Sequence, residues 1–88
     1  MFTEILVDVS DLEAPEPFTE VLSVLTKLQK KAYIRMLHRQ QPFPLYDVLR
    51  ENNLDYCVFE PTSLHTKYTI LIWLAADIET AKHCHQLV

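Results

Sequence analysis

The sequence predicts an α+β fold, a two-layer α/β sandwich of the order β-α-β-α-β-β with a four-stranded mixed sheet. Two observations indicate this class: short β-rich runs alternate with stretches of helical periodicity, and the last two β-rich runs are separated only by a turn-like loop. With 88 residues, 49% of them hydrophobic, the chain can build one core but not two. We therefore expect one domain over residues 1–76, followed by a helical tail over 77–88.

The first half of the chain predicts a strand, a helix and a strand. Residues 3–9 are short and β-rich, and residues 32–37 repeat this character. Between them, a helix over residues 15–30 is predicted by apolar residues that recur every three or four positions, namely Phe18, Val21, Leu22, Leu25 and Leu28. Pro15 suits the first turn of that helix, where a backbone N–H is not needed.

The second half predicts a short helix and a hairpin. Residues 45–53 show helical spacing, and Asn52 or Asn53 is the expected left-handed residue at the helix end, because the chain contains no glycine. Residues 55–60 and 67–74 predict two strands joined by a loop at 61–66. Since a β-α-β crossover is right-handed, both main helices are expected on one face of the sheet.

The predicted last strand is apolar on both faces. Tyr68, Ile70, Ile72 and Leu74 alternate with Leu71 and Trp73, so the face that carries Trp73 needs a cover. One candidate is the tail, as a helix with a stripe of Ile78, Ala81 and either His85 or Val88. The other candidate is a second copy of the chain, in a homodimer through the Trp73 face.

Composition excludes several function classes. The formal charge of −4 argues against DNA or RNA as the main partner, and the absence of glycine excludes a P-loop and a GxGxxG fingerprint. No apolar run approaches the roughly 20 residues of a membrane span, and Glu4 replaces the basic start of a signal peptide. We expect a cytoplasmic protein with no nucleic-acid partner, no membrane partner and no cofactor.

Two motifs support a family resemblance. The segment VDVSDLEAPEPF at the start of the first helix resembles the TusA/SirA-like sulfur-carrier superfamily, in which a Cys-Pro-x-Pro motif opens that helix. Leu12, Pro15, Glu16 and Pro17 match the surroundings of the motif, and Ala14 takes the place of the cysteine. The segment HRQQPFPLY is similar to a bacterial branch of unknown function that pairs PEP with His-x-x-x-Pro-x-Pro-Leu-Tyr, carried here by His38, Pro42, Pro44, Leu45 and Tyr46.

The resemblance covers residues 3–74 and implies a sulfur carrier without its carrier cysteine. A persulfide carrier needs a thiolate whose pKa is lowered at a helix start, and Ala14 cannot supply one. We interpret Cys57 as a small inert hydrophobe within a strand and Cys84 as an exposed thiol without activating neighbours. We predict no catalytic residue, and we keep a sulfur-transfer or redox protein using Cys57 or Cys84 as an alternative function.

The predicted binding site lies where the parallel strands end. Segments 11–16 and 38–43 should meet there, because ligands of open α/β sheets bind at the carboxyl ends of the strands. Glu16, His38, Arg39 and Tyr46 would then supply an acid, a titratable ring, a cation and a phenol for a ligand or a partner protein. The alternative for His38 is a hydrogen bond to the adjacent turn that fixes the loop.

The sequence does not predict a metal site. His83 and His85 in the tail are two positions apart, so they point to different sides of a helix and cannot share one ion. A metal- or haem-associated accessory domain ligated by His38 is the third function that we consider. The leading hypothesis is a small non-catalytic module that binds a partner protein or a small ligand at the edge bearing PEP and His38.

Overall fold

The computed structural model describes residues 1–11, 16–64 and 66–87. It has an α+β fold with four strands and three helices. In chain order these are β1 (Thr3–Asp8), α1 (Glu16–Leu25), β2 (Ala32–His38), α2 (Phe43–Glu51), β3 (Leu54–Phe59), β4 (Tyr68–Leu74) and α3 (Ile78–Gln86).

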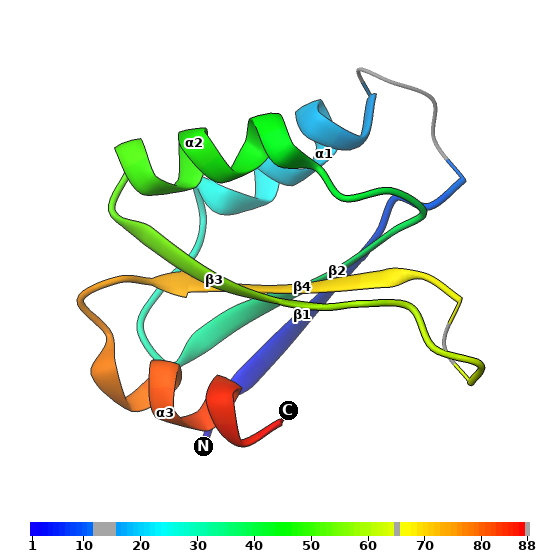
Figure 1. The fold of residues 1–88 in the computed structure, drawn as a ribbon. Helices are drawn as coiled ribbons and strands as arrows, with labels where there is room; N and C mark the ends of the chain where they lie inside the picture. The colour runs from blue at the N-terminus through cyan, green and yellow to red at the C-terminus, as the bar shows by residue number, and fades with distance from the viewer. Residues whose placement is uncertain (12–15, 65, 88) are drawn as a thin grey trace.

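The strands form one mixed sheet in the order β1-β2-β4-β3. β1 and β2 are parallel, whereas β4 is antiparallel to both of its neighbours, β2 and β3. Helices α1 and α2 lie on one face of the sheet and α3 lies on the other (Figure 1). The predicted four-stranded mixed sheet, with both main helices on one face and the last two strands in a hairpin, is confirmed.

The main core lies between the sheet and the first two helices. Alternate residues of the two central strands point into it, as the two-residue period of a strand requires. Its buried members include Val21 of α1, Leu45 and Leu49 of α2, Ile34 and Met36 of β2, and Ile70 and Ile72 of β4. The alternation predicted for the last strand is therefore confirmed on this face.

A smaller core lies on the opposite face, beneath α3. Trp73 is fully buried there, together with Tyr33, Leu71 and Cys84. The ring of His85 lies edge-on to Trp73 at a centroid distance of 5.4 Å. The tail helix therefore covers the Trp73 face within a single chain, which was the first of the two predicted covers.

The face that α3 turns to the sheet differs from the predicted one. Ile78 is 66% exposed, whereas Thr80 and Cys84 are fully buried and Ala81 packs against the smaller core. Asp77 sets this orientation as the N-cap: its carboxylate accepts hydrogen bonds from the Thr80 hydroxyl at 2.6 Å and from the Lys31 backbone N–H at 2.7 Å. The prediction of Ile78 on the buried stripe was wrong because this cap fixes the rotation of the helix.

The bounds of both main helices also differ from the prediction, and α2 spans Phe43–Glu51 rather than residues 45–53. α1 ends at Leu25 rather than near Lys30, and Leu28 is buried from the following turn, so its apolar side chain extended the helical pattern beyond the helix. After α2, Asn53 adopts a φ of 60°, which confirms an asparagine as the left-handed residue. Lys31 has a φ of 61° just before β2, a position that no sequence signal indicated.

Candidate functional site

Three strands end, and the fourth begins, at one edge of the sheet, which we call the strand-end edge. β1 and β2 are parallel, and β4 runs opposite to both β2 and β3, so the carboxyl ends of the first three strands meet the start of β4. Asp8, His38 and Phe59 close their strands there, and Lys67 immediately precedes Tyr68 of β4. The structure therefore brings chemically active side chains together at the predicted edge.

His38 holds the turn that follows β2. Its Nδ1 accepts a hydrogen bond from the backbone N–H of Gln40 at 2.9 Å, which is the contact expected of a residue that fixes the loop. Burial of the ring lowers the pKa of His38 below its ordinary value of 6.5, and the neighbouring Arg39 guanidinium lowers it further. The neutral imidazole is the form that can accept this bond at Nδ1.

Tyr46 lies in the main core. It is 6% exposed, and its ring stacks on Tyr56 of β3 at a centroid distance of 4.4 Å. Its hydroxyl donates a hydrogen bond to Oε1 of Gln41 at 3.1 Å, and burial raises the pKa of Tyr46 to about 12. His38 and Tyr46 therefore hydrogen-bond to adjacent residues of the same loop, Gln40 and Gln41. The buried ring of Tyr46 serves to pack the core.

The other two predicted site residues are Arg39, which the structure describes, and Glu16, of which it describes only the backbone. Arg39 is exposed on the turn after β2. Glu16 begins α1, and its side chain lies outside the described part of the structure. Ala14 and Pro15, the two residues before Glu16, also lie outside it.

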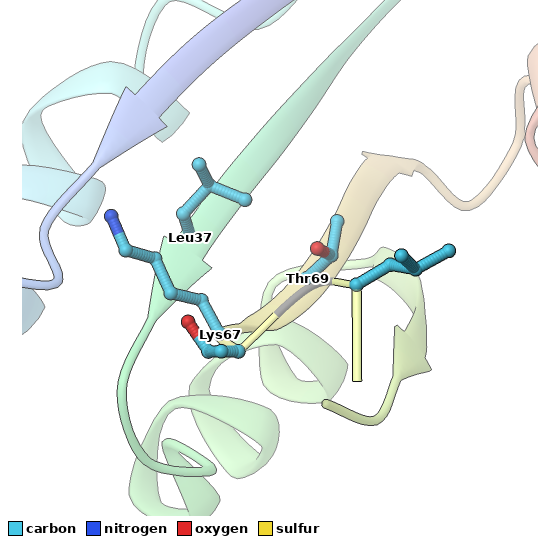
Figure 2. Close-up of a pocket in the computed structure, with 5 residues that line it drawn as sticks. Leu37, Lys67 and Thr69 are labelled. Atoms are coloured by element: carbon cyan, nitrogen blue, oxygen red, sulfur yellow. The ribbon is translucent and has the colours of Figure 1, made fainter. Parts of the chain in front are cut away.

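Two neighbouring hollows mark the strand-end edge on the face that carries α3. The first, which we call the leucine hollow, has a volume of about 230 Å³ and is lined by Leu37, Leu64, Thr66, Lys67 and Thr69. Figure 2 shows the Lys67 side chain extending past Leu37 toward β1, with Thr69 on the adjacent strand. The second, which we call the arginine hollow, has a volume of about 260 Å³ and is lined by Arg35, Phe59, Glu60, Thr62, Lys67, Thr69 and Leu87.

The pairing of the strands explains how the two hollows join. Thr69 of β4 is paired with Leu37 of β2 on one side and with Phe59 of β3 on the other, so these three residues form a row across the sheet. Lys67 and Thr69 line both hollows. The row of Leu37, Thr69 and Phe59 therefore forms one continuous floor beneath the two hollows. Arg35 lies on the α3 side of this floor, and Lys67 lies at the strand-end edge.

Both cations beside this floor have carboxylate partners. Lys67 Nζ lies 3.4 Å from Oδ2 of Asp8, and Arg35 Nε lies 2.8 Å from Oε1 of Glu4. Each acid also has another donor: Ser10 donates its hydroxyl to Asp8 at 2.6 Å, and Tyr33 donates its hydroxyl to Glu4 at 2.8 Å. The hydrogen bonds from Ser10 are the main cause that lowers the pKa of Asp8.

Neither thiol is activated. Cys57 is half-buried in β3, and burial followed by the nearby Asp55 raises its pKa. Cys84, which we expected to be exposed, is fully buried beneath α3, because the N-cap turns this position toward the sheet; burial raises its pKa to about 12. A nucleophilic thiolate is therefore disfavoured at both positions.

The tail histidines make aromatic contacts. The ring of His83 stacks on Phe2 at a centroid distance of 4.3 Å, while His85 contacts Trp73. Among the described residues, no group of three or more His, Cys, Asp or Glu side chains is arranged to hold a metal ion. In the same residues, every helix is too short or too polar to cross a bilayer.

The fold and the hollows define an α+β domain with a polar and apolar surface at its strand ends. Comparison with family models, with curated proteins and with solved structures yields no match. The function is therefore argued from geometry.

Sequence reasoning predicted a site at the strand ends but did not name Arg35, Lys67 and Thr69, which line the hollows. The available signal was the alternation of side chains along the central strands, which places Arg35 and Leu37 on the Trp73 face of β2.

Proposed function

We propose that this chain is a non-catalytic module that binds a small ligand or a partner protein at the strand-end edge bearing the PEP segment and His38. The observation that carries this proposal is the pair of hollows that share Lys67 and Thr69. They combine an apolar floor with a few polar groups, which is the usual composition of a binding site. A larger groove of about 440 Å³ between α1 and α2 is lined by apolar residues with Thr26 and Asn52 and contains no ionisable side chain.

The state of the thiols supports a non-catalytic role. Cys57 and Cys84 both have raised pKa values, and Ala14 stands where the resemblance to sulfur carriers requires a cysteine. The order of the elements, β-α-β-α-β-β followed by α3, supports the further proposal that the chain is a TusA/SirA-like domain without its carrier thiol.

The test is a binding screen read by NMR, residue by residue. A library of small acids, amines, neutral compounds and short peptides is added to the isotope-labelled protein, and shifted backbone amides identify the site. We expect the hits to shift Thr69, Lys67 and Phe59. Thr69→Phe, which places a ring on the shared floor, should abolish these shifts.

The matched control is Thr26→Phe, which places the same ring in the groove between α1 and α2. It should leave the strand-end hits unchanged. Hits that survive Thr69→Phe and disappear with Thr26→Phe would overturn the proposed site. Mass spectrometry after incubation with a cysteine desulfurase and cysteine should show no added sulfur, and a stoichiometric persulfide on Cys57 or Cys84 would overturn the non-catalytic role.

A further inference from the structure

We infer that the ligand of the strand-end edge is a small organic monoanion with an apolar body, whose anionic group lies over Thr69 between Lys67 and Arg35. This inference rests on the proposed function and names the chemical class that the same surface would bind. Four features carry it: the two cations, their present partners, the apolar floor and the nearby acid.

Lys67 can turn to a ligand without leaving the carboxylate of Asp8 unpaired. The 3.4 Å separation of Lys67 Nζ and Asp8 Oδ2 is long for a charge-assisted hydrogen bond, and both side chains are 41% exposed. An exposed pair of this kind contributes little to stability. Asp8 keeps its two bonds from Ser10 when Lys67 moves, so the exchange of partners costs little.

Arg35 is placed to contribute without moving. Its contact with Glu4 uses Nε, so the terminal amino groups of the guanidinium are the donors that it brings to the arginine hollow. Glu4 keeps the Tyr33 hydroxyl as a donor while Arg35 is shared. Thr69, which lines both hollows, adds a hydroxyl donor between the two cations.

The apolar parts of the surface suit a short chain or one ring. Leu37 and Phe59 flank Thr69 on the floor, and two exposed leucines rise beside them, Leu64 at the leucine hollow and Leu87 at the arginine hollow. Volumes of about 230 and 260 Å³ lie below the range of drug-sized pockets. A carboxylic acid with a six- to eight-carbon body is therefore the better fit than a larger cofactor.

The charge balance favours a monoanion over a phosphate. Glu60 lines the arginine hollow beside Arg35 and Lys67, and Glu4 and Asp8 lie behind the cations. The nearby carboxylates would repel a dianion more strongly than a monoanion, whereas a single carboxylate can pair with both cations at once. The apolar floor further favours a ligand that carries a hydrocarbon body.

The experiment titrates the full chain with octanoate, octanol, octylamine and inorganic phosphate, following the amides of Lys67, Thr69 and Phe59 by NMR. Octanoate should bind at least tenfold more tightly than octanol or octylamine, and phosphate should be weaker than octanoate. Lys67→Gln and Arg35→Gln should each weaken octanoate binding about tenfold. Lys82→Gln, which removes one exposed lysine of α3 outside both hollows, is the charge-matched control and should leave the affinity unchanged.

Each outcome decides the inference. Equal affinity for octanoate and octanol, or equal losses in Lys67→Gln and Lys82→Gln, would overturn the assignment of an anion. Saturable shifts with octylamine or with a peptide at the same amides would overturn the ligand class while the proposed binding edge stands. An absence of shifts at this edge with every probe and every library member would overturn both.

Discussion

At the residue scale, His38 combines a structural bond with a titratable ring. The Gln40 N–H points at Nδ1, so protonation of that nitrogen removes the acceptor and breaks the bond. Burial and Arg39 act in the same direction on the pKa. The larger cause of the lowered pKa, the partial burial of the ring, depends on packing and was not predictable from sequence. The smaller cause was predictable, because Arg39 is adjacent to His38 in the sequence.

We predict that an NMR titration will place the pKa of His38 below 6.5. A lowered pKa means that the unfolded chain binds more protons than the folded one between the two values. The stability contributed by neutral His38 is therefore present above the unfolded pKa and is lost as pH falls through the folded one. Arg39→Gln should raise the pKa toward the unperturbed value. A pKa above 6.5 in the wild type would contradict this environment.

The two residues with a positive φ, Lys31 and Asn53, differ in whether their conformation could be predicted from sequence. Asn53 was predictable, because asparagine tolerates a positive φ and follows a helical pattern. Lys31 was not, since lysine carries no such preference. Its conformation is held from a distance, by the hydrogen bond of its N–H to Asp77.

At the element scale, α3 is attached through its first residue. Asp77 is 8% exposed and joins the start of β2 to the first turn of α3. Although burial raises the pKa of Asp77, the hydrogen bonds from Thr80 and Lys31 hold it below the ordinary value of 3.8. The stability that it contributes is thus present above the unfolded pKa and is lost as pH falls through the folded value.

We predict that Asp77→Ala will lower the free energy of unfolding by about 1–2 kcal/mol, the usual cost of losing an N-cap. Urea denaturation at neutral pH is the measurement. Glu79→Ala changes an exposed acid of the same helix turn, whose pair with Lys31 spans 3.8 Å, and should cost at most about 0.5 kcal/mol. Equal effects of the two substitutions would show that the cap does not anchor α3.

Removal of α3 should expose the smaller core. We predict that a chain ending at residue 76 will show red-shifted Trp73 fluorescence and faster alkylation of Cys57, because α3 covers this cluster. The amides of Ile34 and Leu49 should remain dispersed, since they belong to the main core. An unchanged emission maximum, with an unchanged molecular mass, would mean that Trp73 is shielded by other means.

The bounds and the buried face of an element could be predicted where its own residues determine them, and not where distant contacts do. Side chains of a strand point alternately to its two faces, so the residues on each face of β4 could be assigned from sequence. α3 is short, and Ile78 and Ala81 suggested a stripe that a single hydrogen-bonded cap overrides. The hydrophobic pattern of α1 ran on to Leu28 because a buried loop residue looks the same as a helical one.

At the scale of the whole molecule, the order of the elements was predictable and the surface was not. The β-rich and helical segments and the short connections between them allow few arrangements other than a β-α-β unit followed by a hairpin. The hollows, in contrast, combine Arg35, Phe59 and Lys67, which are distant in sequence and meet only through the pairing of β4 with β2 and β3. A site of this kind has no linear motif.

We predict that a fragment of residues 1–66 will not fold, whereas residues 1–76 will. β4 is the central partner of both β2 and β3, and it supplies Ile70 and Ile72 to the main core. Circular dichroism and the dispersion of amide shifts measure the difference. A folded 1–66 fragment would show that β3 can find another partner.

The central place of β4 also bears on how the chain is made. Synthesis proceeds from the N-terminus, so β1 and β2 can pair early, while β3 leaves the ribosome before its partner β4. Until residue 74 has left the ribosome, the edges of β2 and β3 and the half-apolar faces around Cys57 and Phe59 are open to other chains. The interval between the emergence of β3 and that of β4 is thus the stage at which these edges have no partner within the chain.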